Sequence, residues 1–127
     1  MILLPCAVSM FATLPLIAYA APVALQKDMP YVAARTSLLK EGWRPVNLHL
    51  HDDYELMGVE RELFKHNFKE FDSCSIDYSN CVMHYKRGKQ CLTVHTIGER
   101  IRYMKVVDWS SECPQSPPSP VSPPSGK

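Results

Sequence analysis

The chain of 127 residues lacks the sequence patterns that would point directly to a function. Its 14 lysines and arginines are nearly balanced by 13 acidic residues, so a net charge of +1 offers no basic field for nucleic acid. No C-x-x-C pair suggests a zinc site, and Gly-x-Ser-x-Gly, phosphate-loop and H-E-x-x-H motifs are absent. We therefore expect no cofactor and no enzymatic activity.

Charged side chains are also absent before Lys27. Residues 7–18 form an apolar run with the length of a signal-peptide core, and Ala18-Tyr19-Ala20 matches a cleavage site. We expect residues 1–20 to be a signal peptide and residues 21–29 a linker, which predicts export to the periplasm or the extracellular space. Two alternatives are an uncleaved anchor, since about 20 apolar residues cross a bilayer, and a wrongly assigned start. Membrane contact is expected only with an anchor.

A first helix is predicted over residues 30–41. Asp28 is expected to cap it, and Gly42 is placed to end it in the left-handed conformation. The expected buried stripe consists of Val32, Ala33, Ala34, Leu38 and Leu39. Arg35 and Lys40 fall on the opposite side of this helix.

A second helix is predicted over residues 53–66, with Asn67 as its stop. Gly58 lowers the helix propensity in its middle by about 1 kcal/mol. Between the two helices, residues 46–50 alternate apolar and polar side chains, which is typical of a short edge strand.

Three runs in the second half have strand character, namely residues 82–86, 90–97 and 101–109. Two short glycine-containing segments separate them and predict hairpin turns. The expected fold is α+β, with one or two N-terminal helices packed on a three- to four-stranded antiparallel meander over residues 30–113. Residues 114–127 hold six prolines and four serines, which predicts a disordered tail.

Cleavage after Ala20 would leave four of the five cysteines, an even number typical of two disulfides in a small exported domain. Cys81 and Cys91 lie at opposite ends of the first hairpin, roughly 15 Å apart. A disulfide needs Cα atoms within about 7 Å. The last strand returns towards Cys91 just before Cys113, so the expected pairs are Cys74–Cys81 and Cys91–Cys113.

The two faces of the meander differ in composition if both turns contain three residues. One face then collects Val82, Leu92, Val94, Met104 and Val106, which suit packing under the first helix. The other face includes Tyr85, His95, Tyr103 and Trp109, a set typical of a protein-binding surface. The alternative is that the second helix covers these side chains. A change of one residue in turn length would move a strand's residues to the other face.

Histidines supply the remaining candidates. His49 and His51 are alternate residues of an extended segment, so both imidazoles could meet one metal ion, although a polar edge with a helix cap explains them equally. His84 and His95 lie on predicted strands as half-buried histidines. A small hydrolase would need a polar pocket converging on one of them.

The pattern Ala34-Arg35-x-x-Leu38-Leu39-x-x-Gly42-Trp43-x-Pro45-Val46, followed by C-x6-C and a meander, resembles small exported bacterial proteins of uncharacterised function. The order of helix then meander is also similar, in architecture only, to one repeat of the β-lactamase inhibitor protein. The chain differs from that inhibitor in having one unit and a proline-rich tail. The resemblance implies a fold and carries over no catalytic or inhibitory residues.

Together these observations predict an exported domain that binds another protein in the cell envelope. The alternative is a metal-binding envelope protein that uses His49 and His51, and a third reading is a small hydrolase.

Overall fold

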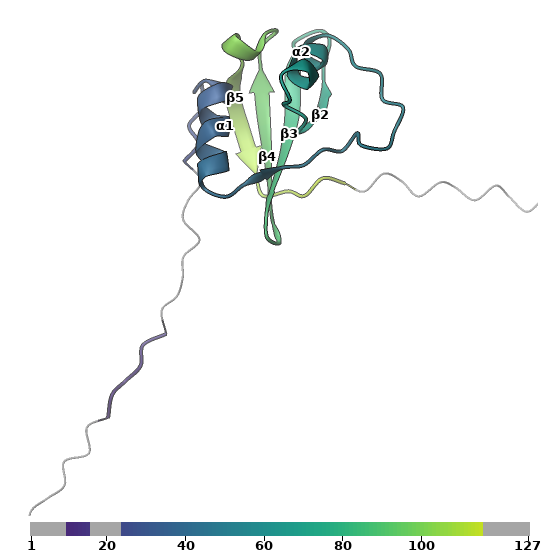
Figure 1. Cartoon of the computed structure of the whole chain (residues 1–127). Coiled ribbons are helices and arrows are strands. Elements are labelled where there is room, and N and C mark those ends of the chain that lie inside the picture. Colours follow the sequence, from purple (N-terminus) through teal and green to yellow (C-terminus); the bar gives the residue numbers. More distant parts are fainter. Residues whose placement is uncertain (1–9, 16–23, 116–127) are drawn as a thin grey trace, which may run out of the picture.

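The structure, a computed structural model, describes residues 10–15 and 24–115 and has two helices on one face of a five-stranded antiparallel sheet (Figure 1). Its elements are α1 (Tyr31–Lys40), β1 (Arg44–Pro45), α2 (Val59–Lys65), β2 (Phe71–Cys74), β3 (Asn80–Arg87), β4 (Gln90–Ile97), the 3₁₀ turn η1 (Ile101–Tyr103) and β5 (Lys105–Ser110). The predicted α+β fold class with two disulfides is therefore confirmed. The expected signal peptide and tail fall mostly outside the described residues, whereas residues 24–29 of the expected linker are described.

Strands β3 and β4 form the centre of the sheet. They pair along their whole length, from Asn80↔Ile97 to Arg87↔Gln90. Strand β5 flanks β4, and the other edge of β3 is shared by β1 at one end and β2 at the other. The meander β3–β4–β5 is the part of the sheet that the alternation of side chains predicts.

Helix α1 ends as the sequence predicts. Gly42 has φ +87, and its N–H bonds to the Leu39 carbonyl at 3.2 Å while the Trp43 N–H bonds to the Leu38 carbonyl at 3.0 Å. These two bonds close the helix in a Schellman motif, which satisfies its last carbonyls. The predicted cap at Asp28 is wrong, because its N–H bonds to the Val106 carbonyl at 2.7 Å and fixes this residue beside β5.

The buried stripe of α1 is also rotated from the prediction. Tyr31, Ala34 and Leu38 are buried, and the expected core residues Val32 and Leu39 are 42% and 41% exposed. Arg35, which was placed on the opposite side, turns inward and pairs with the buried Glu70. Tyr31 and Arg35 both contact the buried Glu70, and a prediction from hydrophobic periodicity does not take such polar contacts into account.

Helix α2 is shorter than the predicted helix over residues 53–66. It begins at Val59, because Gly58 has φ +54 and interrupts any helix at that point, and residues 46–57 form an irregular loop. The predicted stop at Asn67 is confirmed, with φ +63. The Asn67 N–H bonds to the Phe64 carbonyl and the Phe68 N–H to the Leu63 carbonyl, so α2 closes in the same way as α1.

Both short edge strands differ from expectation. The predicted strand over residues 46–50 is absent, and β1 consists of Arg44–Pro45 just before it, with one further bond from the Val46 N–H to the His84 carbonyl at 3.0 Å. Strand β2, at residues 71–74, has no sequence prediction behind it. It follows directly from the closure of α2, which turns the chain back towards β3.

The assignment of side chains to sheet faces is wrong for β3. The β3–β4 loop has two residues, because Arg87 pairs with Gln90, and not the assumed three. Met83 and Tyr85 therefore join Val94 in the core beneath the helices, and Val82 moves to the other face. Between β4 and β5 residues 98–104 form a longer connection in which a Cβ at Gly98 would lie 2.7 Å from the Met104 Cα.

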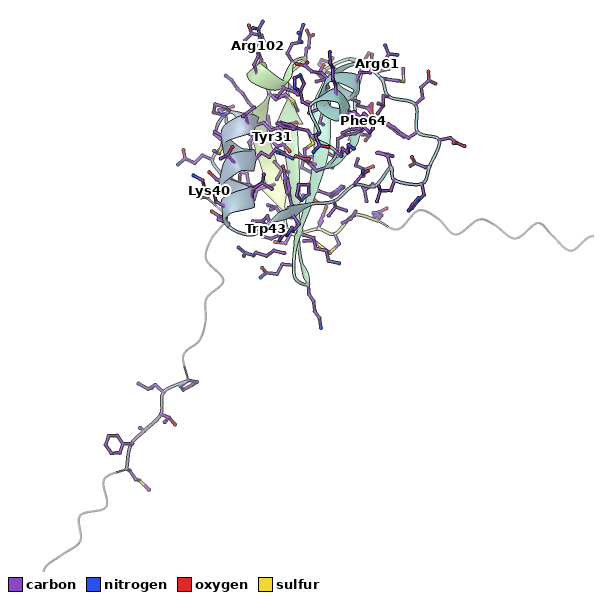
Figure 2. The ribbon with its side chains drawn as sticks, in the orientation of Figure 1. Tyr31, Lys40, Trp43, Arg61, Phe64 and Arg102 are labelled. Carbon is purple, nitrogen blue, oxygen red and sulfur yellow. A yellow bond between two sulfur atoms is a disulfide. The ribbon has the colours of Figure 1, made fainter. Side chains whose placement is uncertain are left out.

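A polar network lies inside the core between α1 and the sheet. Glu70 is fully buried, and its Oε1 accepts hydrogen bonds from the Tyr31 hydroxyl at 2.8 Å and the Tyr85 hydroxyl at 2.9 Å. Arg35 donates to the same carboxylate from the helix side. Figure 2 labels Tyr31, which begins α1. The tyrosine hydroxyls also contact one another. Such a network satisfies buried polar groups that would otherwise be costly.

The two predicted disulfides, Cys74–Cys81 and Cys91–Cys113, are both present. Structural disulfides persist in oxidising surroundings, so they indicate a compartment other than the cytoplasm. Among the helices that the structure describes, neither has the length and apolar composition needed to cross a membrane.

Candidate functional site: a histidine-lined groove

The face of the sheet opposite the helices holds a groove made of two adjoining pockets. The first, of about 460 Å³, is lined mainly by Asp72, His84, Thr93, His95, Glu112 and Gln115. The second, of about 500 Å³, is lined mainly by His49, Leu50, His51, Asp52, Asp72 and Gln115. They share Asp72 and Gln115, and we call the two together the histidine groove.

Strand alternation explains why these residues gather here. His84 and Thr93 are direct cross-strand partners, and His95 is the partner of Val82. Their neighbours Met83 and Val94 point into the core, so the intervening residues must point to the opposite face. The hydrophobic pattern that builds the core therefore also builds the floor of the groove.

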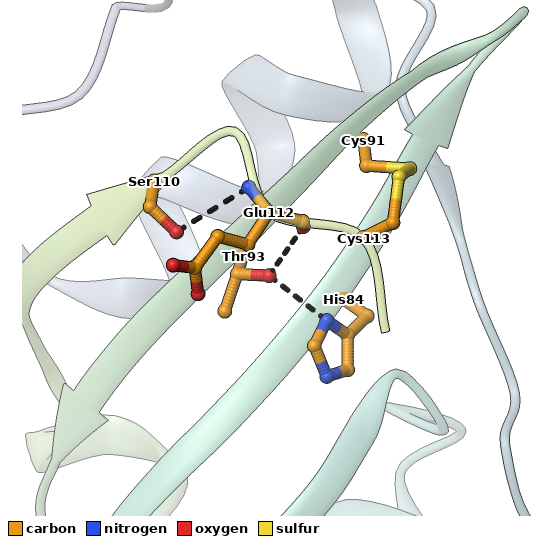
Figure 3. The surroundings of a disulfide bond; sticks show 6 residues. All are labelled: His84, Cys91, Thr93, Ser110, Glu112 and Cys113. Atoms are coloured by element: carbon orange, nitrogen blue, oxygen red, sulfur yellow. Dashed lines mark hydrogen bonds between the residues drawn. A yellow bond between two sulfur atoms is a disulfide. The ribbon is translucent and has the colours of Figure 1, made fainter. Parts of the chain in front are cut away.

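One wall of the groove is the segment of residues 111–115 that follows β5, which we call the strap. Two links hold it to β4, the Cys91–Cys113 disulfide and a hydrogen bond of 2.8 Å from the Thr93 hydroxyl to the Glu112 carbonyl (Figure 3). The Glu112 N–H also bonds to the Ser110 hydroxyl at 3.5 Å. The strap is thus held by a covalent bond and side-chain contacts, without strand pairing.

His84 forms the central link of the first pocket. Its Nδ1 lies 3.0 Å from the Thr93 hydroxyl oxygen, and its Nε2 lies 3.2 Å from Asp72 Oδ2. The Thr93 hydroxyl has a single proton, which it can donate either to the Glu112 carbonyl, 2.8 Å away, or to His84 Nδ1. The contacts Asp72–His84–Thr93–Glu112 connect β2, β3 and β4 to the strap. The small-hydrolase alternative stays a prediction.

His49 links the loop of residues 46–57 to β2. Its Nδ1 lies 2.8 Å from Asp52 Oδ2, and its Nε2 lies 2.7 Å from the Asp72 carbonyl oxygen. Both oxygens are acceptors, so both hydrogen bonds form only when both ring nitrogens carry a proton, and this geometry favours the cationic imidazole. Burial lowers the pKa of His49, but the hydrogen bonds to Asp52 and Asp72 outweigh this, and the pKa is raised from its ordinary value. The ring also stacks on Tyr54 with centroids 3.9 Å apart.

The expected metal pair is not assembled. Both nitrogens of His49 are engaged by protein oxygens, and His51 is exposed. Within residues 10–15 and 24–115 no group of three or more histidine, cysteine, aspartate or glutamate side chains is arranged to hold a metal ion. A metal would have to displace the contacts that fix His49.

The expected aromatic surface is divided among three places. Tyr85 is buried in the core, Tyr103 is 61% exposed on η1, and Trp109 is half-buried against the core. His95 alone of the four lines the histidine groove. The residues that the sequence did not single out are Asp72 on the unpredicted β2, Thr93, and Glu112 on the strap.

In the part of the chain that the structure describes, the charged side chains that line the groove include carboxylates but no lysine or arginine, although the whole chain has nearly equal numbers of acidic and basic residues. Asp52, Asp72 and Glu112 contribute carboxylates, and no lysine or arginine of the described residues lines either pocket.

The resemblance to small exported bacterial proteins and to a β-lactamase inhibitor repeat stays a prediction. Comparison of the chain with protein-family models, with curated proteins and with solved structures found no match.

Proposed function

We propose that the chain is an exported binding domain that takes up an arginine or lysine side chain of another protein in the histidine groove. The observation that carries this proposal is the lining of the groove, which combines three carboxylates with histidines and, among the described residues, includes no lysine or arginine. A charged donor from a partner would meet acceptors on both sides of Asp72. Charge-assisted hydrogen bonds of this kind are about twice as strong as neutral ones.

The compartment in which this occurs is the periplasm or the extracellular space. Support comes from the two disulfides together with the signal-peptide pattern of residues 1–20. N-terminal mass spectrometry of the exported protein should give a chain that begins at Ala21. Material that retains residue 1 would contradict cleavage.

The binding proposal is tested with a short arginine-containing peptide and its citrulline counterpart, which keeps the shape and removes the charge. In NMR titrations of the oxidised protein at pH 7.5, the arginine peptide should shift the signals of residues 72, 84, 95 and 112. Asp72→Asn should weaken binding about 5- to 10-fold, since a charged hydrogen bond contributes about 1.5–3 kcal/mol and this site is open to solvent.

Glu99→Gln serves as the matched control, because Glu99 is an exposed carboxylate outside the groove. It should leave the affinity unchanged. Equal binding of the citrulline peptide, or an equal loss of affinity in Glu99→Gln, would refute the proposal. Thermal melting of each variant separates a lost contact from a lost fold.

A further inference from the structure

A separate pocket, of about 440 Å³, lies between α1, α2 and η1, away from the histidine groove. Its apolar lining consists of Val32, Phe68 and Ile101, and its polar lining of Glu62, His66, Arg100 and Arg102. None of these residues lines the histidine groove. We call it the arginine-rimmed pocket, and its volume is within the range of about 300–1,000 Å³ typical of small-molecule sites.

The floor of this pocket is held rigidly. The Phe68 N–H closes α2 by bonding to the Leu63 carbonyl at 2.8 Å, and the Phe68 ring meets Tyr31 edge-on with centroids 6.2 Å apart. The Arg35 guanidinium lies 4.1 Å from the centroid of the same ring. Ile101 packs on the core from η1, so the apolar floor exists before any ligand arrives.

The rim has more positive than negative charge. Glu62 is the one acidic residue of the lining, and its Oε2 already pairs with Arg100 Nε at 3.2 Å. Arg102 is exposed on η1 (Figure 2). Its guanidinium lies 4.6 Å from the Tyr103 ring centroid. Arg102 is therefore left with its hydrogen-bond donors free of any carboxylate in the lining.

An apolar floor beside an uncompensated guanidinium matches one chemical class. We propose that the arginine-rimmed pocket binds a small amphipathic anion, with an apolar body on Phe68 and Ile101 and a carboxylate on Arg102. Arginine suits this role because its planar donors match a carboxylate in two parallel hydrogen bonds. A neutral ligand of the same shape would bury the same apolar surface and lose the ionic contact.

Octanoate and octanamide form the matched pair of probes. In ¹H–¹⁵N NMR titrations, octanoate should shift the signals of residues 32, 66, 68 and 101 with saturation, and octanamide should bind about 5- to 10-fold more weakly. Arg102→Gln should reduce octanoate binding by a similar factor and leave octanamide unaffected. Arg102→Lys should restore part of the loss.

Arg44→Gln is the control, because Arg44 is an exposed cation on β1 outside this pocket. It should leave octanoate binding unchanged. Absence of saturable shifts, equal binding of both probes, or an equal effect of Arg44→Gln would overturn the proposal. Octanoate should not compete with the arginine peptide, so this outcome is independent of the function proposed for the histidine groove.

Discussion

Arg35→Met should be one of the most damaging single changes in α1. The guanidinium of Arg35 is the positive partner of Glu70, whose carboxylate is fully buried. Removal of one partner of a buried ion pair costs about 3–5 kcal/mol, because the remaining charge has no compensation. The Arg35 side chain is 17% exposed, so water screens part of the interaction, and we expect about 2–4 kcal/mol.

That loss is large beside the whole stability of the domain. A domain of this size has a free energy of unfolding of about 5–14 kcal/mol. For such a domain, 1 kcal/mol corresponds to a shift of about 4–8 °C in Tm. Guanidinium denaturation and thermal melting of oxidised Arg35→Met should therefore show a Tm lowered by about 10–25 °C. Lys40→Met, an exposed change on the same helix, should lie within about 0.5 kcal/mol of the original.

A double-mutant cycle decides whether the network acts as described. Glu70→Met should also destabilise, because it leaves Arg35 facing an apolar core. The double variant Arg35→Met/Glu70→Met should be more stable than the sum of the single effects predicts, since no buried charge remains unpaired. A loss below about 1 kcal/mol in Arg35→Met, or strict additivity in the cycle, would refute the reasoning.

Three further predictions concern the titration of two buried tyrosines, the titration of His49, and the Cys91–Cys113 disulfide. Burial and the neighbouring acidic network raise the pKa values of Tyr31 and Tyr85, so both hydroxyls should stay protonated in absorbance titrations at 295 nm until the protein unfolds. Because the folded pKa exceeds the unfolded value, stability is complete below pH 10 and falls by up to about 1.4 kcal/mol per residue for each pH unit above it. The raised pKa of His49 stabilises the loop of residues 46–57 below pH 6.5, and that contribution should disappear as the pH rises through the folded value, as imidazole NMR will show. Replacement of Cys91 and Cys113 by serine should cost about 3 kcal/mol and increase hydrogen exchange in the strap.

Each of these has an outcome that contradicts it. Ordinary titration of all tyrosines in the folded protein would exclude the buried hydroxyl network. A His49 ring that is neutral at pH 6 would show that its two ring nitrogens do not both donate a proton to Asp52 and Asp72. An unchanged exchange rate in the serine double variant would mean that Thr93 alone holds the strap.

Features set by neighbours in sequence were predictable. The closures at Gly42 and Asn67 depend on single residues that adopt positive φ, and the meander depends on alternation within each strand. The disulfide pairing followed from the direction of three consecutive strands. In each case the determining residues lie within one element, one turn or a run of consecutive elements.

Features set by the length of a turn or by distant residues were not predictable from the same patterns. One residue fewer in the loop at Gly88 exchanged the two faces of β3, which moved Tyr85 from the expected binding surface into the core. Glu70 and Asp72 are separated by one residue, yet one enters the core network and the other the groove. Nothing in their local sequence distinguishes these roles, because each depends on partners contributed by other elements.

The Cys91–Cys113 bond determines how the domain would respond to tension on the chain beyond Gln115. The pull would pass through the sulfur atoms directly to β4 near the tip of the central hairpin, and β5 with its edge contacts would carry no load. Reduction would redirect the same force to β5, which could then detach from the sheet one pair at a time. The oxidised domain is thus suited to hold a C-terminal attachment without losing its core.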